Sequence, residues 1–162
     1  MSKFAGADPF GSAVFGGDPS PFLLTQIDAE TTTEARRLMA RGMYDGTSLQ
    51  AVEFSVGQDG FDPASFYAAV PVNPDATALD DSVFTDTIDH IEPPNAKARS
   101  YYCLLDTTEA NVTLGEIAIW GEVQNSPGDP ADGTKIIMAI GHFPLICKNS
   151  SMQYALRVTH LA

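Results

Sequence analysis

Apolar and polar residues alternate along much of the chain after residue 48, and this alternation predicts β-strands. In residues 49–56, Val52, Phe54 and Val56 fall on one face, while Glu53 and Ser55 fall on the other. Further strand patterns cover residues 83–91, 99–105, 115–123, 135–143 and 152–160. Short strands separated by turn signals are typical of an all-β domain, so we expect an antiparallel β-sandwich or a barrel-like fold.

One segment, residues 32–43, has the spacing of a short α-helix. Thr31 and Glu34 have the spacing of a capping box at its start. Gly42 and the pair Asp45-Gly46 carry the stop signals. The apolar positions that we expect in the core are Ala35, Leu38, Met39 and Met43, and the opposite face carries Arg36, Arg37 and Arg41.

Residues 66–79 contain Pro71 and Pro74 and predict an extended, irregular crossing between two strands. A long polar turn with two prolines covers residues 125–133. The only tryptophan, Trp120, lies in the middle of a predicted strand, and we expect it in the core.

The first 22 residues differ from the rest and predict an extended N-terminal arm in front of a β-rich domain at residues 23–162. Glycine and proline are too frequent in the arm for a helix or a central strand. Residues 4–10 are echoed by residues 15–22, and four phenylalanines are spaced along the arm. We expect these side chains to be partner-binding anchors, unless the arm folds back on its own domain: Phe4, Phe10, Phe15 and Phe22.

Length and charge narrow the class of protein. The chain has 162 residues, 44% of them apolar, and a net charge of −12, which fits one acidic globular domain and makes nucleic-acid binding improbable. No apolar run is long enough for a membrane-spanning helix, and no secretory signal is visible. Residues 42–96 contain ten acids and no Lys or Arg. This segment is either a solvated acidic face or a surface that docks on a basic partner.

The chemistry-bearing residues form no recognisable catalytic pattern. The histidines His90, His142 and His160 lack metal-ligand spacing, and we expect His142 to be structural. No nucleophile elbow, P-loop or dinucleotide glycine pattern is present. We therefore expect a protein that is not an enzyme and has no catalytic residue, metal or cofactor. Cys103 and Cys147 both lie in apolar stretches, which favours two buried thiols, although a bridge between strands stays open.

The order of these elements resembles the amino-terminal attachment domains of phage tail-fibre and tail-collar proteins. The resemblance covers residues 30–162. It rests on the helix at residues 35–43, the stretch 52–60 ending in Val56-Gly57-Gln58-Asp59-Gly60, and the proline-rich crossing 71–79. It continues in Leu114-Gly115-Glu116-Ile117 and in the strand 133–144, which ends in Ile140-Gly141-His142-Phe143-Pro144. Two features depart from the family: the Phe/Gly/Pro arm, and the end of the chain at Ala162, where fibre proteins continue into a shaft and a receptor-binding tip.

The resemblance implies a structural virion protein of a tailed phage, made in the host cytoplasm without a signal peptide. We expect a tail-fibre adaptor or baseplate component that docks through its arm and presents the β domain to neighbouring tail, baseplate, collar or fibre proteins. It would act as a homo-oligomer, such as a trimer, within a symmetric assembly, with no nucleic acid and no membrane. Two alternatives stay open. One is a capsid decoration or head-fibre protein. The other is a carbohydrate-binding β-sandwich that uses aromatic residues such as Trp120, Tyr101, Tyr102 and Tyr154.

Overall fold

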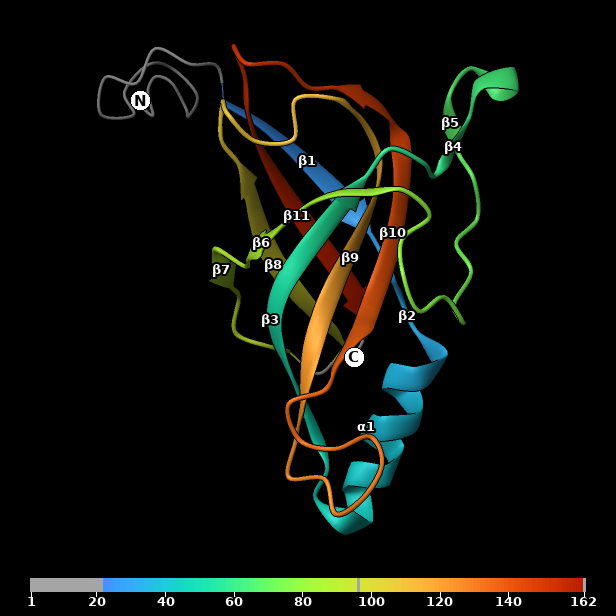
Figure 1. The fold of residues 1–162 in the computed structure, drawn as a ribbon, viewed down its shortest axis with the longest axis vertical. Coiled ribbons are helices and arrows are strands. Elements are labelled where there is room, and N and C mark those ends of the chain that lie inside the picture. The colour runs from blue at the N-terminus through green and yellow to red at the C-terminus, as the bar shows by residue number, and fades with distance from the viewer. Residues whose placement is uncertain (1–21, 96, 162) are drawn as a thin grey trace.

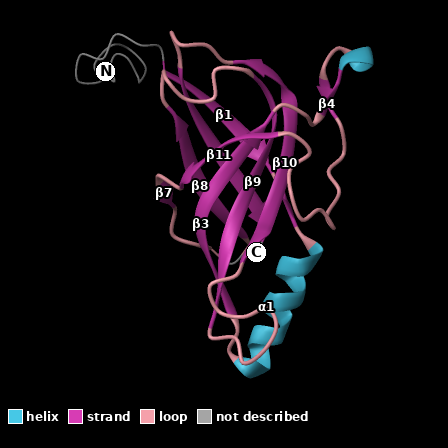
Figure 2. Cartoon of the chain, viewed as in Figure 1, coloured by secondary structure: helices cyan, strands magenta, loops and turns pink. Residues whose placement is uncertain are grey.

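The computed structural model describes residues 22–95 and 97–161, and within them the chain is mainly β (Figures 1 and 2). One sheet has the order β1-β11-β8-β7, and a second has the order β2-β10-β9-β3-β6. The bounds of the strands are β1 (Phe22–Asp28), β2 (Glu30–Thr31), β3 (Ser48–Gly57), β6 (Ser82–Thr87), β7 (His90–Ile91), β8 (Ala98–Leu105), β9 (Thr113–Gln124), β10 (Lys135–Cys147) and β11 (Gln153–Leu161). All pairings in the two sheets are antiparallel except that of β1 with β11.

The two sheets pack face to face around one core, which confirms the expected β-sandwich. The four-stranded sheet contributes Tyr101, Cys103 and Leu156. The five-stranded sheet contributes Phe54 and Ile117, each with no exposed surface. Alternate residues of these strands face inward, and this is why the alternation of apolar and polar residues in the sequence predicted the strands.

The five-stranded sheet is covered on its outer face as well. There Ala118 of β9 and Ile140 of β10 pack with Leu79 and with Val72. Leu79 and Val72 belong to the crossing segment that the two prolines predicted. This segment therefore covers the outer face of the sheet with irregular chain. Trp120, which we expected in the core, is half-buried in this second cluster and does not lie between the two sheets.

The one α-helix of the described residues, α1 (Thr33–Asp45), lies at the lower end of the sandwich in Figure 1. The capping position predicted at Thr31 is wrong by one residue, because the hydroxyl of Thr32 accepts the N–H of Ala35. Of the two predicted stop signals, the pair Asp45-Gly46 is confirmed, whereas Gly42 does not end the helix. The helix continues to Asp45 and closes at Gly46, whose left-handed backbone donates its N–H to Gly42 O at 3.1 Å.

Met43, predicted in the core, is 87% exposed. In the last helical turn, the backbone of Gly42 packs against the backbone of Thr47. The two are so close that a Cβ at position 42 would collide with the Thr47 carbonyl. The helix therefore turns Met43 away from the sheet. Its core contacts come from Ala35 and Leu38, both without exposed surface.

The two cysteines differ from the expectation of two buried thiols. Cys103 is buried between the sheets, whereas Cys147 at the end of β10 is exposed, and both are free. Cys147 pairs with Thr113 of β9 and Cys103 pairs with Leu156 of β11, so the two thiols lie in different sheets. No helix of the described ranges has the length and apolar character needed to cross a membrane.

Candidate functional site

Residues 61–69 form a projection that stands off from the sandwich beside β10, and we call it the finger (Figure 1). Two short strands, β4 (Phe61–Asp62) and β5 (Ala68–Ala69), pair antiparallel and enclose a 3₁₀ turn, η1 (Pro63–Ser65). The side chain of Asp62 caps this turn, because it accepts Ala64 N at 2.9 Å and Ser65 Oγ at 3.0 Å. The sequence builds the turn with Asp-Pro, which pre-sets the backbone for it.

Two aromatic residues at the tip, Phe66 and Tyr67, both have a left-handed backbone with φ 58°. This conformation costs a non-glycine residue about 1–2 kcal/mol. The ring of Tyr67 packs on that of Phe61 at 5.7 Å between centroids, but the side chain of Phe66 is 98% exposed. The finger therefore holds a large apolar ring in solvent on a strained backbone, an arrangement typical of binding elements.

Two hydrogen bonds from β10 hold the finger where its chain returns from the tip toward the sandwich. Leu145 N donates to Tyr67 O at 3.2 Å, and His142 Nδ1 donates to Val70 O at 2.9 Å. Because a carbonyl oxygen only accepts, the proton of a neutral His142 lies on Nδ1. His142 thus acts as a structural donor, as expected from its place in an apolar strand.

A buried carboxylate fixes the two chain segments that lead to and from the finger and the crossing. Glu116 of β9 has no exposed surface, and its Oε2 accepts Asp81 N at 2.9 Å and Asp59 N at 3.3 Å. Its Oε1 accepts Asp80 N at 3.1 Å. Three backbone donors replace the water that this carboxylate loses on burial. We call this arrangement the Glu116 clamp.

The glycines at the clamp are required by close packing. A Cβ at Gly57 would collide with the Glu116 carboxylate, and a Cβ at Gly115 would collide with the Phe61 ring at the base of the finger. Larger residues at either position would push the clamp or the finger out of place.

The clamp brings together three of the five stretches on which the resemblance rests, namely residues 52–60, 114–117 and 133–144. Gly57 and Asp59 come from the first, Gly115 and Glu116 from the second, and His142 from the third, where it pairs with Glu116 in register. These stretches are far apart in the sequence and meet at the root of the finger. These five residues therefore help to hold the finger and the crossing on the five-stranded sheet.

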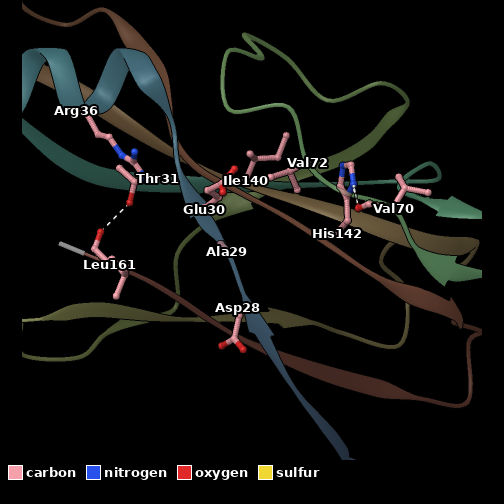
Figure 3. Close-up of a pocket in the computed structure, with 10 residues that line it drawn as sticks. All are labelled: Asp28, Ala29, Glu30, Thr31, Arg36, Val70, Val72, Ile140, His142 and Leu161. Carbon is pink, nitrogen blue, oxygen red and sulfur yellow. Dashed lines mark hydrogen bonds between the residues drawn. The ribbon is translucent and has the colours of Figure 1, made fainter.

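A pocket of about 390 Å³ lies beside the finger base, between β1–β2, α1 and the crossing (Figure 3). Its charged and titratable groups are Asp28, Glu30, Arg36 and His142, and its apolar wall includes Val72 and Ile140. Thr31 Oγ1 donates to Leu161 O at 2.7 Å across one end. Among the described residues, no three His, Cys, Asp or Glu side chains are grouped closely enough to hold a metal ion.

The buried side chains of Thr31, Tyr101 and His160 form a closed hydrogen-bonded network within the sandwich. His160 Nδ1 lies 3.1 Å from Leu161 O and 2.8 Å from Thr31 Oγ1, so Nδ1 carries the proton. Nε2 then accepts from Tyr101 Oη at 3.0 Å. Burial lowers the pKa of His160 to about 4 and raises the pKa of Tyr101 to about 12. Every polar atom of this network is used internally, so its role is structural.

The acidic segment 42–96 retains most of its charge in the fold. Cations from elsewhere reach three of its ten acids, in the pairs Arg41–Asp45, Lys135–Glu53 and Arg157–Glu92. Seven aspartates of the segment have no ion pair among the described residues, and two of them, Asp59 and Asp62, flank the root of the finger. The aromatic tip is thus presented from an acidic surrounding.

Of the four phenylalanines predicted as anchors, only Phe22 belongs to the described residues. Phe4, Phe10 and Phe15 lie outside the described residues. Phe22 is the first residue of β1, where its backbone pairs with Gln153 of β11. Phe66 and Glu116 were not predicted from the sequence as functional residues. The available signals were a Phe-Tyr pair between two prolines, and one acid inside the apolar stretch 114–120.

Comparison with known proteins adds no relative: no protein family, curated protein or solved structure matches the chain.

Proposed function

We propose that the chain is a structural protein of a tailed-phage particle, a tail-fibre adaptor or baseplate component. Its N-terminal arm docks on the particle, and its β-sandwich presents the finger to a neighbouring tail or fibre protein. The proposal rests on the resemblance of residues 30–162 to fibre and collar attachment domains, and on the geometry of the finger.

Phe66 is the observation that carries the proposal. A fully solvated phenyl ring on a left-handed backbone costs stability in the isolated chain. Such a cost is compensated when the ring enters a pocket on a partner, where aromatic anchors dominate binding. The Glu116 clamp and His142 supply the rigid base that keeps this anchor in position.

The surroundings of the finger define the chemistry of the partner. Asp59 and Asp62 flank the root, and segment 42–96 contains no cation of its own. A partner surface with an apolar pocket and a rim of Lys or Arg would complement both features. Such a surface belongs to a protein, so the finger favours a role in assembly.

The test is quantitative mass spectrometry on gradient-purified particles of the phage that encodes the chain. We expect a copy number that is a small multiple of three or six per particle. Phe66→Ala should reduce incorporation, whereas Val83→Ala, a matched change of an exposed apolar residue on β6, should not. Absence of the chain from particles would overturn the proposal.

Two other experimental outcomes would favour one of the alternative functions. Hundreds of copies per particle would assign the chain to the capsid surface as a decoration or head-fibre protein. Binding on a glycan array would favour a carbohydrate-binding module. The aromatic residues considered for that role, Trp120, Tyr101, Tyr102 and Tyr154, are all buried or half-buried, so they form no open platform for a sugar.

A further inference from the structure

Two apolar pockets meet at one arginine at the end of the sandwich next to α1. One pocket, of about 360 Å³, is lined by Met39 and Met43 of the helix. The other, of about 330 Å³, is lined by Ile91 and Tyr101. Both are also lined by Leu49, Met138 and Arg99, so Arg99 lies between them. We call this surface the Arg99 groove.

Arg99 is an uncompensated cation. Its Nε is buried and has no hydrogen-bond partner, and no ion pair to its guanidinium exists among the described residues. Glu92 lines the same groove but is already paired with Arg157 at 2.8 Å. A buried N–H without an acceptor is costly, and a carboxylate is the acceptor that fits a guanidinium best.

The groove also exposes apolar side chains at both of its ends. Met43 is 87% exposed in the pocket next to α1, and Ile91 is exposed in the other. A ligand that satisfies the groove therefore needs a carboxylate with an apolar group on each side of it.

The N-terminal arm contains this combination of groups. Asp8 has Phe4 four residues before it and Phe10 two residues after it. One phenyl ring would then be available for each pocket while the Asp8 carboxylate meets Arg99. The pattern is repeated later in the arm by Phe15, Asp18 and Phe22, and this repeat ends at the first residue of β1.

The length of chain between each aspartate and β1 decides which of them can reach the Arg99 groove. Phe22 pairs with Gln153 and Arg99 pairs with His160, so the arm joins β11 seven residues away from the groove, about 23 Å along the strand. Asp18 is four residues from Phe22 and spans at most about 14 Å. Asp8 is fourteen residues from Phe22 and spans up to about 50 Å, which exceeds the distance to the groove and leaves length to cross to another copy.

We propose that the Arg99 groove binds the Phe4–Phe10 segment of the arm of a second copy of this chain, with Asp8 on Arg99. Copies joined in this way form a head-to-tail contact, which closes into a ring when the rotation between copies allows it. The inference deepens the proposed function and rests on its docking arm, because it names the arm's immediate partner as a neighbouring copy.

The experiment uses full-length chains and sedimentation velocity over a range of concentrations. The wild type should self-associate. Asp8→Lys and Arg99→Glu should each weaken association by about tenfold or more, because each leaves a charge against a like charge. Asp18→Lys and Arg36→Glu are matched controls, one in the same arm and one at another unpaired arginine, and should associate like the wild type. Arg99→Gln, with circular dichroism, checks that any loss does not come from misfolding.

Mixing the two defective variants separates contacts between chains from contacts within one chain. In an equimolar mixture, Lys at position 8 meets Glu at position 99 of the other variant, and Asp8 meets Arg99. Association should therefore return to near the wild-type level. Failure of the mixture to associate would overturn the exchange between copies. A wild type that stays monomeric at about 100 μM, well above the dissociation constant of a weak specific complex, would overturn the proposal as a whole.

The result is independent of particle incorporation. A chain that is found in particles but stays monomeric in solution removes the arm exchange and leaves the proposed function. A chain that associates through Arg99 but is absent from particles removes the proposed function and leaves the arm exchange.

Discussion

The carboxylate of Glu116 accepts the backbone N–H of Asp81 at 2.9 Å, although the two residues are 35 positions apart in the chain. The same carboxylate holds Asp59 and Asp80, so one side chain fixes both ends of the segment that contains the finger and the crossing. The position of Phe66 therefore depends on a buried side chain of β9, in a part of the chain far from the finger in sequence.

Glu116→Gln should destabilise the protein by about 3 kcal/mol, because an amide offers only one acceptor oxygen and turns its NH₂ toward a backbone N–H. Urea unfolding would measure the change in free energy. Hydrogen exchange of the Asp80 and Asp81 amides should accelerate, since these are the groups that lose an acceptor.

Glu122→Gln on the same strand is the matched control, because the Glu122 side chain forms no hydrogen bond among the described residues. It should leave the unfolding free energy within about 0.5 kcal/mol of the wild type. Equal stability of the Glu116→Gln and Glu122→Gln variants would show that the clamp contributes nothing to the fold.

His160 should make stability depend on pH between about 6.5 and 4. Burial lowers its pKa in the folded protein to about 4 from the ordinary 6.5, so the unfolded chain binds the proton more readily. Stability from this group is complete above pH 6.5 and is lost as the pH falls through this window. The loss should reach about 3 kcal/mol by pH 4.

Urea unfolding at pH 7 and at pH 4 would measure this difference. His160→Gln should flatten the dependence by the same amount, whatever its effect on stability at pH 7. His90→Gln, at an exposed histidine on β7, should keep the wild-type slope. A His160→Gln variant with an unchanged slope would assign the pH dependence to other groups.

The elements with strong local patterns were predictable, and those held by distant partners were not. Strand β3 was predicted within one residue at each end, because Phe54 and Val56 face the core in strict alternation. The helix cap was misplaced because Thr31 is used by His160, which lies 129 residues away. Both Thr31 and Thr32 have the side chain of a cap, and only the fold decides between them.

Strand β1 was missed for a related reason. Its residues carry little alternation, with Leu23 and Leu24 both exposed, and its partner β11 lies at the other end of the chain in a parallel pairing. The sequence could only indicate that the arm ends near residue 22. In the candidate site, the motifs around Glu116 and Asp59 were both visible in the sequence. Nothing local indicated that the backbone N–H groups of Asp59, Asp80 and Asp81 meet the Glu116 carboxylate, because only the fold brings them together.

The two cysteines should react at very different rates with a thiol reagent. Cys147 is exposed, whereas Cys103 has no exposed surface, and burial raises the pKa of its thiol. Reagents attack the thiolate, so labelling of the folded protein should stop at one thiol per chain. In denaturant the count should rise to two. Cys147→Ser should abolish the fast phase, and a fast phase that survives would place Cys103 within reach of solvent.

Replacement of Phe66 should separate stability from assembly. With φ 58° and a side chain that is 98% exposed, Phe66 contributes strain and little packing. Phe66→Gly should therefore raise the unfolding free energy by about 0.5–1 kcal/mol, because the relief of left-handed strain exceeds the extra entropy of glycine in the unfolded chain. The same variant should lose incorporation into particles. Tyr67→Gly is the comparison at the same φ, and it should gain less stability because it also loses the contact with Phe61. A Phe66→Gly variant that is destabilised would mean that the ring packs on its own chain, and the finger would then be a structural loop rather than a docking element.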